Sequence, residues 1–220
     1  MSRQYQDPQP MVRSYDMRKR DLAAEATRDA IIDAAHGLLS RPDGGSLTVQ
    51  EVADAAGVSR ATVYSRVGSR RDLLTAVFVD QGRLIRFDRV LDAMELDDPM
   101  EGVLSTVRES CRAWAVMPDA IRRTLALAVL DPEVGGLVHQ FERHRRERLR
   151  GLAKRALKAH GVTALSEVRE ASCRLALMTS FSAFDHIRVE HSVDRTARYL
   201  VAMTQRLFGI TMHREGANGR

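Results

Sequence analysis

One segment, residues 47–74 (LTVQEVADAAGVSRATVYSRVGSRRDLL), constrains the fold of this chain more than any other. It predicts a helix, a tight turn, a second short helix and the start of a third. Thr48 is suited to cap the first helix, and Glu51, three residues later, can complete a capping box. Gly57 follows at the position where the chain must leave the helix, which favours a residue without a Cβ atom. Ser59 can then cap the second helix.

The spacing of small and branched residues in this segment predicts a helix-turn-helix. Two helices that cross at close range need a small residue such as Ala53 on the first, a glycine in the turn, and a branched apolar residue such as Val63 on the second. Ser69 with Asp72 predicts another capping box, which would open a long helix at Arg70. The surface left exposed on the second helix is short, polar and cationic, and consists of Arg60, Ala61, Thr62, Tyr64, Ser65 and Arg66. Such a surface suits a helix that enters a DNA major groove.

Residues 28–78 resemble the DNA-binding domain of TetR-family (tetracycline-repressor type) transcriptional regulators. The matching positions are the apolar helix 30–39, Thr48-Val49, Val52-Ala53, Ala56-Gly57-Val58-Ser59, Thr62-Val63-Tyr64, Ser69-Arg70 and Leu73-Leu74. This combined pattern is more specific than a helix-turn-helix alone. The rest of the chain resembles the family only in its length and its helical character. The resemblance implies a homodimeric repressor that binds a near-palindromic double-stranded DNA operator and is released by a small-molecule effector.

The resemblance also implies which side chains meet DNA. Phosphate contacts fall at Thr48, Tyr64, Ser65, Arg66 and Arg70. Base-edge contacts fall at Gln50, Arg60, Ala61 and Thr62. Hydrogen-bond chemistry agrees with the base contacts. An arginine can form two hydrogen bonds to a guanine, a glutamine can form two to an adenine, and a small apolar side chain can contact a thymine methyl group. The alternative for Tyr64 is an aromatic residue of the core, and Arg71 is expected to be a solvated charge.

Helix formers dominate the whole chain and alternating strand patterns are scarce, so the predicted fold class is all-α. We expect a disordered basic arm at 1–22, the helix-turn-helix domain at 23–70, a helical effector-binding and dimerisation domain at 71–212, and a disordered tail at 213–220. The arm is either a solubilising tail or a segment that contacts DNA.

Turn and capping residues predict where the helices lie. The first helix is expected from about Thr27 to Leu39, followed by a turn at 42–45. One long helix is predicted from Arg70 to about Met94, which would join the two domains without a linker. The later helices are predicted at 99–116, 119–130, 132–160, 164–189 and 193–208.

Aromatic and methionine residues in the second domain are candidates for an effector pocket. They are Trp114, Met117, Phe141, Met178, Phe181 and Phe184. Such residues at helical spacing are more often ordinary core, so both interpretations stay open. A pocket of this composition would take a small apolar or aromatic effector.

Small residues along 164–189 predict a close helix–helix contact. The ridge consists of Ser172, Ala176, Ser180 and Ala183, and the last helix adds Leu200, Thr204 and Leu207. The resemblance implies that these helices pair with their copies in a second subunit. The alternative is packing within one subunit.

Charge alone is a weak argument for DNA binding here. The net charge is +5, yet residues 1–80 contain eleven Lys and Arg against eleven Asp and Glu. The case for DNA therefore rests on the placement of individual arginines. The surplus lies in residues 142–158, which we interpret as a solvated helix face.

Other functional classes find little support in the sequence. Phosphate-binding glycine loops, nucleophile elbows and paired-carboxylate signatures are absent, so no enzyme activity, cofactor or metal is expected. Asp185, His186 and Glu190 lack further ligands at metal-binding spacing. The remaining alternative is an enzyme or small-molecule carrier that keeps the helix-turn-helix as a scaffold. No apolar run is long enough to span a membrane, so a cytoplasmic protein with two reduced core cysteines, Cys111 and Cys173, is expected.

Overall fold

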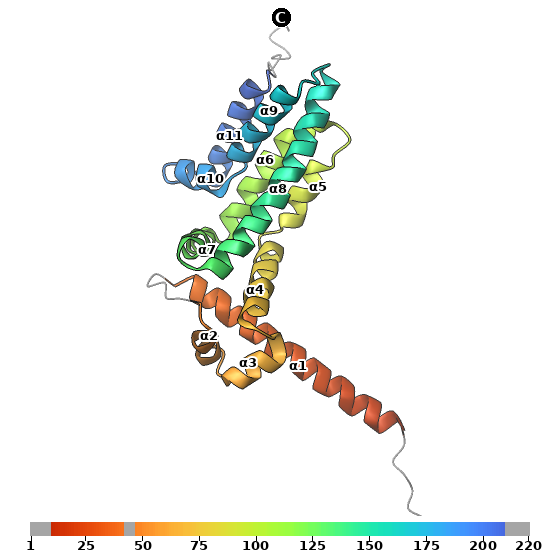
Figure 1. The fold of residues 1–220 in the computed structure, drawn as a ribbon, viewed down its shortest axis with the longest axis vertical. Helices are drawn as coiled ribbons and strands as arrows, with labels where there is room; N and C mark the ends of the chain where they lie inside the picture. The colour runs from red at the N-terminus through yellow and green to blue at the C-terminus, as the bar shows by residue number, and fades with distance from the viewer. Residues whose placement is uncertain (1–9, 42–46, 210–220) are drawn as a thin grey trace, which may run out of the picture. The chain divides into compact units, whose positions relative to one another are not determined.

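The computed structural model describes residues 10–41 and 47–209 of the 220-residue chain (Figure 1). Within these ranges the chain forms eleven α-helices and no strand, which confirms the all-α prediction. The helices are α1 (Pro10–Leu39), α2 (Val49–Ala55), α3 (Arg60–Val67), α4 (Arg70–Leu84), α5 (Phe87–Met94), α6 (Pro99–Val116), α7 (Pro118–Leu130), α8 (Pro132–Ala159), α9 (Leu165–Met178), α10 (Phe181–Arg188) and α11 (Val193–Leu207). The predicted turn at 42–45 and tail at 213–220 lie outside the described residues.

The chain divides into two compact units, Met1–Val77 and Phe78–Arg220. The division falls inside α4, a few residues after the boundary at Arg70 that the sequence predicted. The earlier turns of α4 therefore belong to the first unit, and its last turns belong to the second.

The first unit is organised around the second half of α1, which packs against α2 and α3. Its core consists of small and branched side chains closed off from water, chiefly Ile31, Ala35, Val52, Ala53, Val63 and Leu73. Ala53 and Val63 are both 0% exposed, as the predicted close crossing of α2 and α3 requires. The helix-turn-helix is therefore present.

Helix α1 begins at Pro10, although the sequence predicted disorder up to residue 22 and a helix only from about Thr27. Proline fits a first helical turn because its missing N–H would have no partner there. Strong helix formers such as Met17, Arg18 and Leu22 follow. Helix propensity thus extends α1 well before its apolar pattern starts. Residues 1–9 of the predicted arm lie outside the described part of the chain.

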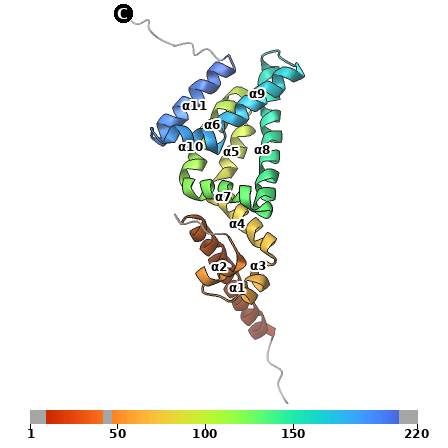
Figure 2. The same ribbon diagram turned by 60° about the vertical axis from the view of Figure 1, so that its left-hand side comes forward.

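The second unit is a helical bundle with α6 at its centre. Helix α6 packs against α5, α8 and α11, and α8 packs in turn against α7 and α9 (Figures 1 and 2). The buried face of α6 carries Val103, Val107, Cys111 and Trp114 at helical spacing. This face positions Trp114 at the end of α6, where the bundle is hollow.

Two helices that the sequence predicted as continuous are broken. Between α4 and α5, Arg86 adopts the left-handed conformation, with φ 55° and ψ 45°. Between α9 and α10, Ser180 caps a new helix by accepting a hydrogen bond from the backbone N–H of Ala183. Each break is followed at once by a buried phenylalanine, Phe87 or Phe181. Local helix propensity permits a continuous helix at both positions, so the residue types alone did not reveal the breaks.

Candidate nucleic-acid interface and ligand cavity

The start of α2 is fixed by the predicted capping box. The Thr48 backbone N–H donates to Glu51 Oε2 at 2.9 Å, and the Glu51 backbone N–H donates to Thr48 Oγ1 at 3.2 Å. Gly57, at φ 66°, provides the left-handed turn after α2. Ser59 then caps α3 by accepting from the backbone N–H of Thr62 at 3.1 Å. These local bonds orient α3 relative to α2.

Helix α3 buries Val63 and presents its other side to solvent. Arg60, Ala61, Ser65 and Arg66 are exposed, and Tyr64 is 45% exposed. The exposure of Tyr64 excludes the core alternative for this side chain. Within the described residues Arg60 and Arg66 make no ion pair, so both guanidinium groups stay available for an anion. Thr62 is half-buried, and its hydroxyl lies 2.9 Å from that of Ser59.

Three of the side chains predicted to contact DNA make hydrogen bonds within the protein. Thr48 belongs to the capping box. Gln50 is exposed, but its amide donates to Asp54 Oδ1 at 2.7 Å. The Arg70 guanidinium donates to the Leu47 backbone carbonyl at 3.3 Å and so links α4 to the start of α2. Whether these side chains also contact DNA stays a prediction.

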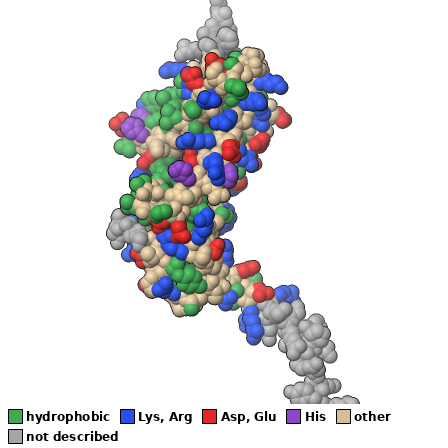
Figure 3. Space-filling view, in the orientation of Figure 1, with side chains coloured by type: hydrophobic (Ala, Val, Ile, Leu, Met, Phe, Trp, Pro, Cys, Tyr) green, Lys and Arg blue, Asp and Glu red, His purple; other side chains and the backbone are tan. Residues whose placement is uncertain are grey.

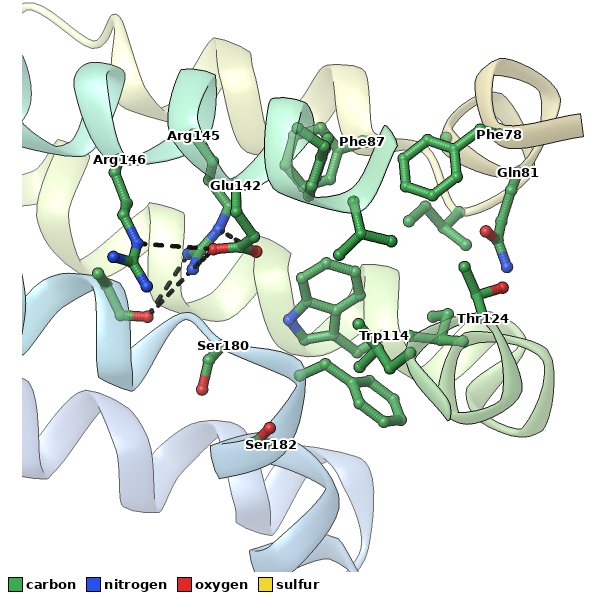
Figure 4. A pocket seen from close by; sticks show the side chains of 18 of the residues that line it. Phe78, Gln81, Phe87, Trp114, Thr124, Glu142, Arg145, Arg146, Ser180 and Ser182 are labelled. Carbon is green, nitrogen blue, oxygen red and sulfur yellow. Dashed lines mark hydrogen bonds and ion pairs between the residues drawn. The ribbon is translucent and has the colours of Figure 1, made fainter. Parts of the chain in front are cut away.

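The second unit contains a partly open cavity of about 750 Å³. Its walls come from the last turns of α4 and from α5 to α10 (Figure 4). The apolar wall combines five aromatic side chains, Phe78, Phe87, Trp114, Phe141 and Phe181, with aliphatic ones that include Ile85, Ile121, Leu125, Val138 and Leu177. The rings contact one another, with the Phe87 and Phe141 centroids 5.0 Å apart and the Trp114 and Phe181 centroids 6.1 Å apart. The cavity has the size and composition of a small-molecule site.

One end of the cavity is polar and charged. Arg145 is buried, and it donates to both carboxylate oxygens of Glu142, at 3.0 and 2.8 Å, and to Thr179 Oγ1 at 2.8 Å. The Trp114 indole N–H donates to the Thr179 carbonyl at 3.0 Å. Thr179 therefore ties α6 and α8 to the break between α9 and α10.

The structure divides the six predicted ligand contacts in half. Trp114, Phe141 and Phe181 line the cavity. Met117, Met178 and Phe184 instead pack in or against the core, and Phe184 is completely buried. The cavity is also lined by Phe78, Gln81 and Phe87, which were not among the predicted ligand contacts. Their positions in a predicted helix do not distinguish a cavity wall from ordinary core.

The predicted dimer contacts are also divided. Ser172, Ala176 and Ser180 line the cavity, while Ala183 is half-buried. Leu200 and Thr204 are 1% and 0% exposed because α11 turns them toward its own subunit. The exposed apolar side of α11 instead carries Tyr199, Met203 and the predicted Leu207. Hydrophobic side chains gather there between charged ones (Figure 3).

Metal binding and membrane insertion find no support in the described residues. No group of three or more His, Cys, Asp or Glu side chains is arranged for a metal. Asp185 instead accepts from Arg122 at 3.1 and 2.8 Å. No helix in the described ranges is long and apolar enough to cross a membrane. Of the two cysteines, Cys111 is buried as predicted, whereas Cys173 is exposed at the cavity and is not a core residue.

Comparison with known proteins finds transcriptional regulators. Residues 31–77 match the profile of bacterial regulatory proteins of the tetR family. An uncharacterized HTH-type transcriptional regulator of Mycobacterium tuberculosis (strain H37Rv) is 34% identical over 95 residues, which are 43% of this chain and 45% of that protein. The HTH-type transcriptional regulator AlkX of the same strain is 40% identical over 79 residues, 34% of this chain and 35% of that protein. This chain thus spans less than half the length of these relatives.

Solved structures show a similar fold over most of the chain. The TetR family transcriptional regulator PfmR of Thermus thermophilus has a TM-score of 0.57 at 18% identity, covering 87% of this chain and 97% of that one. A Clostridium perfringens protein provisionally assigned to the regulation of fatty acid metabolism has a TM-score of 0.61 at 16% identity, covering 84% and 100%. At these identities the likeness concerns the fold alone.

Proposed function

Residues 31–77 match the tetR family of bacterial regulatory proteins, and on that premise we propose that the chain is a ligand-responsive transcriptional repressor. The observation that carries the proposal is the outer face of α3. Arg60 and Arg66 extend from it without ion pairs in the described structure, on the same exposed face as Tyr64. A short cationic helix on a fixed helix-turn-helix scaffold matches the dimensions and the hydrogen-bonding groups of a major groove.

We propose that two copies bind a near-palindromic operator. A symmetric pair places its two recognition helices in successive major grooves, about 34 Å apart. The exposed side of α11, with Tyr199, Met203 and Leu207, is the proposed pairing face. Its apolar residues recur every four positions and so form one stripe along the helix.

The cavity of the second unit is the proposed effector site. Helix α4 connects it to the DNA-binding unit, because the helix starts at Arg70 beside α2 and ends among residues that line the cavity, including Phe78 and Gln81. An effector that binds one orientation of α4 better than another would shift the population of DNA-competent dimers. Release of the operator would follow from that differential affinity.

The test is binding of the purified protein to labelled DNA from upstream of its own gene and of the adjoining genes. We expect specific binding to at least one fragment, with an affinity that falls as salt rises, because phosphate contacts displace counterions. Equal affinity for all fragments and for random DNA would contradict the proposal. It would leave the alternative of a carrier or enzyme that keeps the helix-turn-helix as a scaffold.

A further inference from the structure

Positively charged residues outnumber negatively charged ones in the wall of the cavity. Four charged side chains line it, namely Glu142, Arg145, Arg146 and Arg150, and all come from α8. Three arginines against one glutamate leave a positive surplus at this end. The labelled members of the group lie together at one end of the cavity, away from Gln81 and Thr124 (Figure 4).

Glu142 is already occupied by Arg145. The buried Arg145 engages both oxygens of this carboxylate and also donates to Thr179, so its donors are largely used within the protein. Arg146 approaches Glu142 only to 3.9 Å and its side chain is 72% exposed. Arg150 is exposed and makes no ion pair in the described structure. The surplus charge therefore resides on Arg146 and Arg150, which can still take an anionic group.

The opposite end of the cavity holds an unsatisfied hydrogen-bond donor. Gln81 is 6% exposed, yet its side-chain Nε2 has no hydrogen-bond partner. A buried amide without a partner costs free energy, so such a group in a cavity wall points to an acceptor brought by a ligand. Between this amide and the arginines lie the rings of Trp114 and Phe87 (Figure 4).

We infer that the effector is an organic acid with three parts. Its acidic group binds Arg146 and Arg150, its apolar body packs on the aromatic wall, and a neutral hydrogen-bond acceptor at its far end receives the Gln81 amide. This inference deepens the proposed function and rests on it for the term effector. The binding itself can be measured without DNA, because Trp114, the only tryptophan of the chain, reports on the cavity wall.

The first experiment compares ligands with the same tail and different heads. Decanoate, decanol and decyltrimethylammonium, each below its micelle concentration, are titrated while Trp114 fluorescence is followed. We expect decanoate to bind about tenfold more tightly than decanol, and the cation to bind least, because only the acid gains a charge-assisted bond. Equal affinities for acid and alcohol, or no binding by any of the three, would overturn the inference.

Matched variants test whether Arg146 and Arg150 bind the acidic group of the ligand. The double variant R146Q/R150Q should reduce decanoate affinity to about that of decanol and leave decanol binding unchanged. Arg143→Gln is the control, since Arg143 is exposed on the same helix and does not line the cavity. A loss of decanoate affinity as large in the control as in the double variant would show a general charge effect and reject the site.

The far end is tested with ω-hydroxy acids from hexanoate to dodecanoate, each paired with its unsubstituted parent. We expect wild-type protein to prefer one of the hydroxy acids to its parent, and Gln81→Leu to reverse that preference. An unchanged preference in the variant would remove Gln81 from the site. Ligand binding without specific DNA binding would refute the proposed function alone, whereas specific DNA binding without acid selectivity would refute this inference alone.

Discussion

At the residue scale, the arginines near the DNA-facing surface have different tasks. Arg60 extends from α3 into solvent, whereas Arg70 also holds the Leu47 carbonyl. Arg71 is exposed beside Arg70 and has no predicted contact with DNA. Equal changes of charge at these three positions should therefore have unequal effects.

We expect Arg60→Ala to relax base preference at one position of each half-site, at a cost of about 1–3 kcal/mol. Arg70→Ala should weaken all sequences alike and lower the salt slope by about one for each lost phosphate contact. Because Arg70 also supports α2, its variant should lose some thermal stability as well. Arg71→Ala is the matched control. Titrations by fluorescence anisotropy at several salt concentrations measure all three, and sequence-blind losses of the same size for Arg60 and Arg70 would reject the assignment.

The two thiols should differ sharply in reactivity. Burial raises the pKa of the Cys111 thiol from its usual 9.0 to about 12, whereas Cys173 is exposed at the cavity. Because the thiolate is the reactive form, a thiol reagent at about pH 8 should modify one cysteine per chain, Cys173. A ligand in the cavity should slow that reaction, since Cys173 lines the cavity. Rapid modification of both thiols in the folded protein would contradict the structure.

The same pKa shift has a consequence for stability. Above its usual pKa of 9.0 the Cys111 thiol ionises in the unfolded chain but stays protonated in the fold until about 12. The unfolded state then binds fewer protons, so the free energy of unfolding should fall as pH rises through this window. Denaturant melts of wild-type protein and Cys111→Ala at alkaline pH should show a steeper pH dependence for the wild type.

At the element scale, close helix approaches set requirements that differ between neighbouring residues. Gly135 and Gly136 are adjacent in α8. A Cβ atom at Gly135 would lie 2.7 Å from the backbone carbonyl oxygen of Ala128 in α7, whereas a Cβ at Gly136 would meet nothing within 4 Å. The sequence does not distinguish the two glycines, because the approach of α7 exists only in the packed bundle.

Gly135→Ala should accordingly destabilise the protein, by about 1–3 kcal/mol, since the carbonyl oxygen belongs to a backbone that cannot simply rotate away. Gly136→Ala should stabilise it by about 0.5–1 kcal/mol, because alanine loses less backbone entropy in a helix. Thermal unfolding of the two variants checks the prediction. Equal effects of the same sign would show that α7 is not held against α8 at this point.

At the scale of the whole molecule, we propose that operator binding depends on dimer formation and on whether the cavity holds an effector. The predicted ridge of small residues is split by the break at Ser180, and its members Ser172 and Ala176 line the cavity. Bulky variants there would test the cavity and not the dimer. The exposed Met203 of α11 is the sharper probe of assembly.

Met203→Glu should turn the dimer into monomers, because it places a charge in the proposed apolar pairing face. Operator affinity should fall with it, since a monomer keeps half of the contacts. The control is Val129→Glu, which adds the same charge at a residue of α7 that is 83% exposed. Analytical sedimentation and DNA titration measure both effects. A Met203→Glu protein that sediments as a dimer would place the interface elsewhere.

Coupling between the cavity and DNA must be reciprocal. If an effector raises the dissociation constant for operator DNA by some factor, on the order of 5–150, then saturating operator must raise the dissociation constant for that effector by the same factor. Trp114 fluorescence supplies the second measurement and anisotropy of labelled DNA the first. A compound that binds the cavity with no change in DNA affinity would not be an effector.

The sequence by itself determined the features that depend on neighbours along the chain. The capping bonds of Thr48, Glu51 and Ser59, and the turn at Gly57, span only a few residues and are recognisable from residue type. The crossing of Ala53 with Val63 follows directly from them. For this reason the helix-turn-helix and the all-α class were predicted correctly, and with them the match of residues 31–77 to the tetR family.

Only the tertiary structure decided which apolar residues become core, cavity or exposed face. An apolar stripe identifies a helix side without identifying what covers it, so Leu200 and Met203 look equivalent in sequence although one is buried and the other is exposed. The charged end of the cavity brings Arg145 to Thr179, 34 residues away, through the packing of α8 on α9. The breaks at Arg86 and Ser180 depend on the same packing, because local propensity permits one continuous helix across each of them.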